Sequence, residues 1–150
     1  MSGIEKQIAL LYSKNSNEAY EALKELQKMS FQSDEVYAHL DEFISMLDSE
    51  NSYLRSRGLT LISANAKWDC NNKINTVIDS YLQHITDAKP ITARCCIKSL
   101  SELAEHKPEL KNKIISALQN ADLSAYKDSM QPLIRRDIDE VLADLGCKEK

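Results

Sequence analysis

The chain has 150 residues, of which 43% are hydrophobic and 28% charged, and its formal net charge at pH 7 is −4. This length predicts one domain with a substantial core, and the acidic balance argues against bulk electrostatic attraction to nucleic acid or an anionic membrane. Three glycines and three prolines are few, which suits an all-helical chain with short connections.

Targeting and metal-binding signals are missing from the sequence. No apolar run approaches the roughly 20 residues that span a bilayer, and the N-terminus lacks the basic and apolar regions of a secretory signal. The four cysteines (Cys70, Cys95, Cys96 and Cys147) show no CxxC spacing, and the three histidines are far apart. The expectation is therefore a cytoplasmic protein with free thiols, no cofactor, no metal and no membrane partner.

Apolar residues recur at the spacing of a buried helix face along most of the chain. The first helix is expected from about residue 2 to 13. The apolar stripes of the eight expected helices cover residues 4–11, 19–29, 36–47, 54–62, 74–85, 93–104, 110–121 and 134–145. We find no alternating strand pattern of useful length.

Four residues with special backbone chemistry refine this expectation. Gly58 lies inside a helix at a cost of about 1 kcal/mol relative to alanine, which predicts a close helix–helix approach there. Pro90 suits the first position of a helix, and Pro132 opens the last one. Gly146 is placed to end that last helix as its C′ residue.

An aspartate followed seven positions later by an arginine occurs three times. The pairs are Asp48 and Arg55, Asp87 and Arg94, and Asp128 and Arg135. The successive arginines are 39 and 41 residues apart. A period near 40 residues built from two helices is typical of an α-solenoid, in which stacked helix pairs share a continuous core.

These segments, above all Asp87…Pro90…Ala93-Arg94, resemble the HEAT/armadillo-like repeats. The resemblance implies an all-α, right-handed α-α superhelix of about eight helices in antiparallel pairs, forming a single domain over residues 1–150. The implied repeats are 2–47, 48–86, 87–121 and 122–146, with a short tail at 147–150. The spacing from aspartate to arginine is one residue longer than the commonest family spacing, and the first repeat lacks both residues, as a capping repeat would.

In that family such pairs are structural. Each aspartate is expected to bond backbone N–H groups at a turn, and each arginine to reach the aspartate of the neighbouring repeat. Lys67-Trp68-Asp69 is also similar to a phrase in small bacterial proteins with this repeat, some of which are linked to iron–sulfur cluster assembly.

No catalytic motif is found, so the expected function is a HEAT-like scaffold or binding module for a protein or peptide. The candidate binding residues are Trp68, Asp69, Lys73, Asn75, Thr76, Gln83, Lys111 and Asn112. One alternative is a nucleic-acid-acting protein similar to helical-repeat DNA glycosylases, with Asp69 as an exposed carboxylate beside Trp68. Others are an accessory role in iron–sulfur cluster assembly and self-association into a homo-oligomer. The structural interpretation of Trp68 is an interhelix packing residue whose indole N–H donates to a carbonyl.

Overall fold

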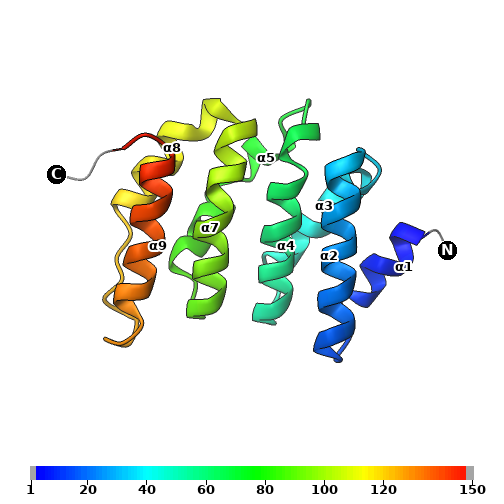
Figure 1. Cartoon of the computed structure of the whole chain (residues 1–150), viewed down its shortest axis with the longest axis horizontal. Helices are drawn as coiled ribbons and strands as arrows, with labels where there is room; N and C mark the ends of the chain where they lie inside the picture. The colour runs from blue at the N-terminus through cyan, green and yellow to red at the C-terminus, as the bar shows by residue number, and fades with distance from the viewer. Residues whose placement is uncertain (1–2, 148–150) are drawn as a thin grey trace. The chain divides into compact units, whose positions relative to one another are not determined.

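The computed structural model describes residues 3–147, and all regular structure in that range is helical (Figure 1). The α-helices are α1 (Gly3–Leu10), α2 (Ser16–Gln32), α3 (Leu40–Met46), α4 (Ser52–Ala64), α5 (Lys73–Thr76), α6 (Ile78–Leu82), α7 (Pro90–His106), α8 (Lys111–Gln119) and α9 (Gln131–Asp144). Four 3-10 helices accompany them: η1 (Val36–His39), η2 (Ala66–Trp68), η3 (Gln83–Thr86) and η4 (Pro108–Leu110). The expected all-α class is confirmed. Residue 2 of the expected first helix and residues 148–150 of the expected tail lie outside the described range.

The chain divides into two compact units, with the boundary between Asn71 and Asn72. Unit 1 contains α1 to α4 with η1 and η2, and unit 2 contains α5 to α9 with η3 and η4. The boundary falls inside the expected repeat 48–86, so its α4 and η2 belong to unit 1 and its α5, α6 and η3 belong to unit 2.

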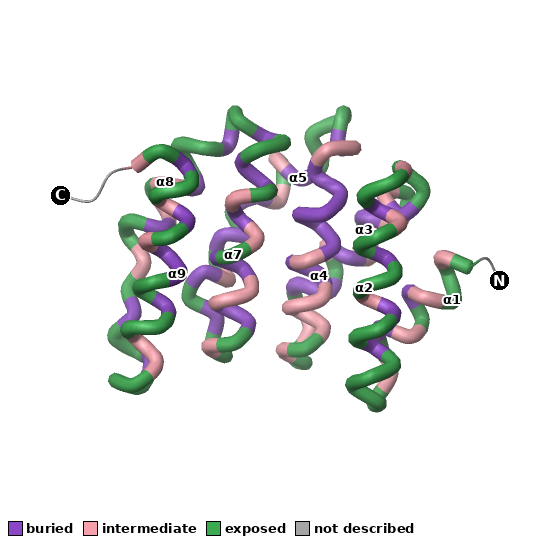
Figure 2. The backbone as a smooth tube through the Cα atoms, viewed as in Figure 1, coloured by how far each residue is buried: buried purple, intermediate pink, exposed green. Residues whose placement is uncertain are grey.

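In unit 1, α4 packs against both α2 and α3, and α1 packs against α2. The second half of α4 is buried almost throughout (Figure 2). A Cβ atom on Gly58 would lie 2.8 Å from the carbonyl oxygen of Phe43 and 2.9 Å from the Cβ atom of Met46. Both distances are shorter than side chains tolerate, so the close approach of α3 and α4 requires a residue without a side chain. The expectation for Gly58 is confirmed.

Unit 2 opens with a segment expected to be one continuous helix, and that expectation is wrong. The segment consists of α5, α6 and η3, with a break at Val77, where φ is −115° and ψ is 13°. β-branched residues lose side-chain freedom in a helix, and they dominate the sequence Ile74-Asn-Thr-Val-Ile78. The hydroxyl of Thr76 also donates to the carbonyl of Lys73 at 2.6 Å, which offers the backbone a local alternative to helical bonds.

The long helices α7 and α9 of unit 2 pack against each other. Pro90 begins α7, and Pro132 lies in the first turn of α9, both as expected. Gly146 has φ of 86°. The amide of Cys147 donates to Leu142 at 2.8 Å, and that of Gly146 donates to Ala143 at 3.0 Å. This pair of bonds is a Schellman motif, which confirms the expected helix end.

The three expected joins between aspartates and arginines differ from one another. Asp87 behaves as expected at its turn, because its Oδ1 accepts a hydrogen bond from the amide of Lys89 at 2.9 Å. Arg94 was expected to reach the aspartate of a neighbouring repeat, but it forms no bond with Asp128, the candidate in unit 2. Its Nε instead donates to Oδ2 of Asp137 at 2.6 Å. Asp137 is only 4% exposed on α9, whereas Asp128 lies in the exposed turn before that helix.

The outer two pairs have other contacts. Arg55 donates to the carbonyl oxygens of Ser49 and Glu50, at 3.0 and 3.2 Å, and so binds its own turn. The carboxylates of Asp48 and Asp128 are exposed, and neither forms a hydrogen bond or ion pair with any residue in the range 3–147. Arg135 is exposed on α9.

Candidate binding surface

The end of α2 and the η2 turn of unit 1 bring an exposed phenylalanine together with a half-buried lysine and tryptophan. Phe31 is 77% exposed, although it occupies the last turn of α2. The ammonium of Lys67 lies 4.2 Å from the centre of the Phe31 ring and 5.3 Å from that of the Trp68 ring. Lys67 also donates to the Phe31 carbonyl at 2.8 Å. We call Phe31, Lys67 and Trp68 the aromatic ridge.

A network of buried polar groups lies beside the aromatic ridge and is hydrogen-bonded to Trp68. The indole Nε1 of Trp68 donates to the carbonyl of Ser30 at 2.8 Å, which confirms the expected bond of that N–H group. The side-chain amide of Asn65 donates to the Ser30 hydroxyl at 3.0 Å and to the Leu61 carbonyl at 2.8 Å. Asn65 and Ser30 are both fully buried. The Oδ1 of Asn65 has no hydrogen-bond partner among the described residues, so it is the bond from the Trp68 indole to Ser30 that fixes the tryptophan of the ridge.

Asp69 does not belong to the exposed surface, and its expected role as an accessible carboxylate is wrong. The residue is 3% exposed, and its Oδ1 accepts a short hydrogen bond from the hydroxyl of Tyr37. Burial first, and then this carboxylate, raise the pKa of Tyr37. The carboxylate thus ties η2 to η1 inside unit 1.

The remaining expected binding residues lie in unit 2, on different elements. Lys73, Thr76 and Gln83 are exposed on α5 and η3, and Lys111 and Asn112 are exposed at the start of α8. Asn75 is half-buried, and its amide donates to Oε2 of Glu109 at 3.0 Å. The Asn75 bond joins α5 to η4, so this residue has a structural contact.

Sequence reasoning missed a second bond, which joins the residues that directly precede these two elements. Lys107 is only 4% exposed. Its ammonium donates to Oδ1 of Asn72 at 2.7 Å, and Asn72 adopts a left-handed backbone conformation with φ of 59°. Asparagine tolerates that conformation better than most residues. No signal in the sequence separates this lysine from the solvated ones, because its burial depends on packing.

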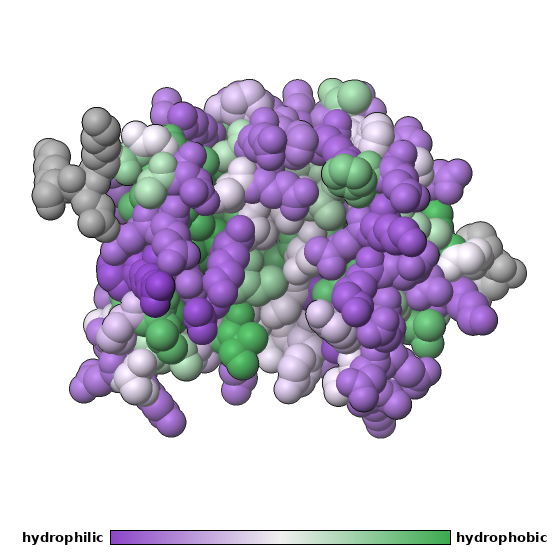
Figure 3. All heavy atoms as spheres, in the orientation of Figure 1, coloured by the Kyte–Doolittle hydropathy of each residue, from purple (hydrophilic) through white to green (hydrophobic). Residues whose placement is uncertain are grey.

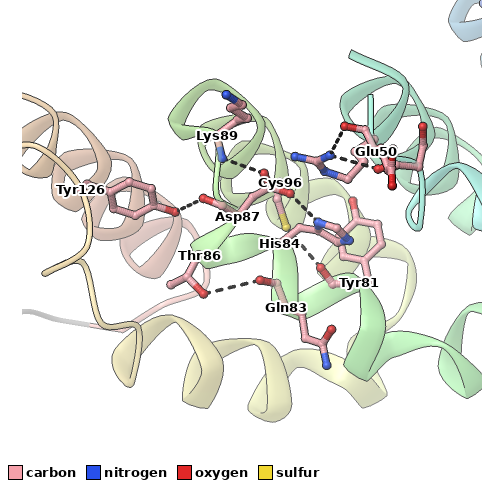
Figure 4. A network of polar contacts seen from close by, with 11 residues as sticks. Glu50, Tyr81, Gln83, His84, Thr86, Asp87, Lys89, Cys96 and Tyr126 are labelled. Atoms are coloured by element: carbon pink, nitrogen blue, oxygen red, sulfur yellow. Dashed lines mark hydrogen bonds and ion pairs between the residues drawn. The ribbon is translucent and has the colours of Figure 1, made fainter. Parts of the chain in front are cut away.

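The stretch from His84 to Cys96 forms a second buried cluster, in unit 2 (Figure 4). The two carboxylate oxygens of Asp87 bind separate partners: Oδ1 accepts the Lys89 amide, and Oδ2 lies 2.7 Å from Nδ1 of His84. The carbonyl of Asp87 accepts the hydroxyl of Tyr126 at 2.5 Å. The cluster therefore connects η3, the start of α7 and the turn before α9.

Cys96 lies beside this cluster, but its thiol is not placed for nucleophilic chemistry. The side chain is fully buried, and Sγ donates to the carbonyl of Tyr81 at 3.5 Å. Burial raises the pKa of the thiol well above its usual value, and only the thiolate is an effective nucleophile. The hydrogen bonds of the neighbouring His84 and Asp87 join segments of unit 2 and have a structural role.

Tyr126 gives this cluster a measurable dependence on pH. Burial, followed by the charge of Asp87, raises the pKa of Tyr126 to about 12. A folded-state pKa above the unfolded value of 10 contributes stability that is complete below pH 10 and is lost as pH rises toward 12. We expect Tyr126 to account for about 1 kcal/mol of the stability that urea unfolding shows to be lost between pH 9 and 11. Tyr12 and Tyr37, whose pKa values are also raised, add to the loss in the wild type.

The same titration in Tyr126→Phe checks this assignment. That variant should lose less stability over this pH range than the wild type, whereas the control Tyr53→Phe, at a residue 67% exposed, should lose as much as the wild type. Equal pH dependence in all three proteins would contradict the role of Tyr126.

Comparison with known proteins provides no family for this chain: no family model matches it, and neither curated proteins nor solved structures show a significant similarity. Within residues 3–147, no group of three or more His, Cys, Asp or Glu side chains is placed to hold a metal ion. No helix in that range has both the length and the apolar character needed to cross a membrane.

Proposed function

We propose that the chain is a non-catalytic, HEAT-like binding module for a protein or peptide in the cytoplasm, and that the aromatic ridge is its contact surface. The observation that carries this proposal is the 77% exposure of Phe31 beside Lys67 and Trp68. Exposed aromatic residues held rigidly are typical anchors of protein interfaces, because they bury a large area at little entropic cost.

The surroundings of the ridge support this choice. Hydrophilic side chains cover most of the face of α2 that Figure 3 shows. An exposed phenylalanine is therefore unusual on this helix. Two other exposed aromatic residues of unit 1 also lie under cations: Tyr20 under Lys24 at 4.8 Å, and Tyr53 under Arg57 at 5.7 Å. Of these cations, Lys24 is paired with a carboxylate of Glu21 at 3.2 Å.

The ridge chemistry defines the ligand class. The Phe31 ring offers an apolar contact. The Lys67 ammonium offers a positive charge that contacts a carbonyl and two ring faces but no carboxylate of residues 3–147. A peptide with an apolar or aromatic side chain next to an acidic one complements both groups. The nucleic-acid alternative needed an exposed carboxylate beside Trp68, and Asp69 is buried.

A peptide-display selection on the full chain tests the proposal. Enriched peptides are titrated while the fluorescence of Trp68, the chain's one tryptophan, is recorded. We expect acidic–aromatic peptides to shift this fluorescence, and Phe31→Ala to weaken their binding at least about tenfold. Lys67→Gln should reduce the preference for acidic peptides and the salt dependence of binding.

Tyr53→Ala is the matched control, because it removes another exposed aromatic residue from the same unit. Its affinity should equal that of the wild type. Peptides that bind Phe31→Ala as tightly as the wild type, or a selection that enriches none, would overturn the assignment of the ridge.

A further inference from the structure

The two long helices of unit 2 begin at the same end of that unit. Arg94 donates to Asp137 at 2.6 Å, and the hydroxyl of Ser101 donates to Oδ2 of Asp144 at 3.1 Å. Both bonds join residues 43 positions apart, so α7 and α9 run parallel in one register (Figure 1). The first turns of the two helices therefore lie beside each other.

Each of these first turns carries an exposed aliphatic side chain. Ile91 on α7 is 76% exposed, and Leu133 on α9 is 41% exposed. Ile91 comes three residues before Arg94, and Leu133 comes four residues before Asp137. Residues three or four apart share one face of a helix, so both side chains lie one turn away from the bond between Arg94 and Asp137. We call Ile91 and Leu133 the aliphatic pair.

The α7 side of the aliphatic pair is positively charged. Residues 88–101, which include the first three turns of α7, contain no aspartate or glutamate. Lys89 and Lys98 are exposed in this segment, and their ammonium groups form no hydrogen bond or ion pair with a residue from 3 to 147. Lys98 follows Ile91 by seven residues, the spacing that returns to the same helix face.

The acidic residues of α9 do not neutralise these two lysines. Asp137 is buried and already binds the arginine of α7, and Glu140 is paired with Arg136 at 3.2 Å. The other charged residues around the start of α9 balance one another in pairs of opposite sign, Lys127 with Asp128 and Arg135 with Asp139. The surface around the aliphatic pair thus keeps an excess of positive charge, to which the N-terminal ends of two parallel helices add.

We propose that the first turns of α7 and α9 are a second docking surface, and that an acidic amphipathic helix of a partner protein occupies it. Two aliphatic side chains of that helix contact Ile91 and Leu133, and its carboxylates bind Lys89 and Lys98. The axes of packed helices lie about 8–10 Å apart, and seven residues of α-helix rise about 10 Å. Aliphatic residues seven positions apart therefore match the aliphatic pair. This surface includes no residue of the aromatic ridge and does not depend on the function proposed above.

Fluorescence anisotropy of a labelled helical peptide, added to the full chain, tests this proposal. The probe carries two leucines seven residues apart with glutamates on both sides of them, and a scrambled peptide of the same composition is its control. We expect the probe to bind, more weakly as salt rises, because exposed charges are screened within about 10 Å at 0.1 M salt. Ile91→Asp and Lys98→Glu should each weaken binding at least about tenfold. Both positions are exposed, and circular dichroism verifies that the variants fold.

Two further variants separate this surface from the rest of the chain. Lys113→Glu reverses another exposed lysine of unit 2, and Phe31→Ala removes the phenylalanine of the aromatic ridge, so both should bind the probe like the wild type. The proposal is overturned by a probe that does not bind at about 1 mM, by a scrambled peptide that binds equally well, or by Ile91→Asp binding as tightly as the wild type. It is also overturned if Ile91→Asp abolishes self-association or binding to anionic vesicles, because a second copy or a membrane would then be the occupant.

Discussion

Gly58→Ala should destabilise the protein by roughly 1–3 kcal/mol, although alanine is the better helix former by about 1 kcal/mol. The added Cβ would lie 2.8 Å from the backbone carbonyl oxygen of Phe43. A backbone atom cannot rotate away as a long side chain can, so α3 and α4 must separate and lose packing along their contact. Urea unfolding followed by circular dichroism gives the difference in free energy of unfolding.

Gly3→Ala is the matched control for this measurement. Gly3 begins α1, and a Cβ atom there would have no atom within 4 Å. Its replacement should leave stability unchanged or slightly raised. A Gly58→Ala protein as stable as the wild type would show that α3 and α4 do not require their close approach.

Asp137→Ala should cost about 2–4 kcal/mol, because it leaves the partly buried Arg94 without its carboxylate partner. Asp137 is 4% exposed and accepts hydrogen bonds from both Nε and Nη2 of Arg94, at 2.6 and 3.5 Å. The Asp137 hydrogen bond raises the pKa of Arg94, which shows that the pair favours the charged guanidinium. Chemical unfolding of the two single variants and of the double variant with Arg94→Ala measures the coupling energy.

The exposed ion pair of Arg136 and Glu140 provides the comparison. Both side chains are largely solvated, and such pairs contribute about 0–1 kcal/mol. Arg136→Ala should therefore have little effect on unfolding. If Asp137→Ala were equally mild, or if the double variant showed no coupling, the stacking role of the Arg94–Asp137 bond would be refuted.

Local chemistry explains which features could be predicted from the sequence. Gly58, Pro90 and Gly146 each have a backbone property that few structural positions need, so their roles follow from position alone. The indole N–H of Trp68 needs an acceptor wherever the ring is covered, and it finds the carbonyl of Ser30. The all-α class follows from the helical spacing of the apolar residues.

Features that depend on contacts between residues far apart in the sequence could not be predicted from sequence patterns. The acceptor of Arg94 lies 43 residues away, and nothing in the Asp–Arg spacing distinguishes Asp137 from Asp128. In the sequence, Asp69 resembles an exposed carboxylate at a turn. In the structure, its carboxylate accepts a hydrogen bond from the hydroxyl of Tyr37. Phe31 was missed for the opposite reason, because an aromatic residue in an amphipathic helix is normally assumed to be buried.

Arg55, Arg94 and Arg135 occupy equivalent positions in the sequence but have different surroundings. Arg55 binds carbonyl groups of its own turn, Arg94 binds a carboxylate on another helix, and Arg135 faces solvent. The three segments are therefore similar in sequence but not equivalent in structure. A chimera that inserted a duplicate of α7 after α9 would have to bring an acidic acceptor with it, so lengthening this chain requires matched changes in two segments at once.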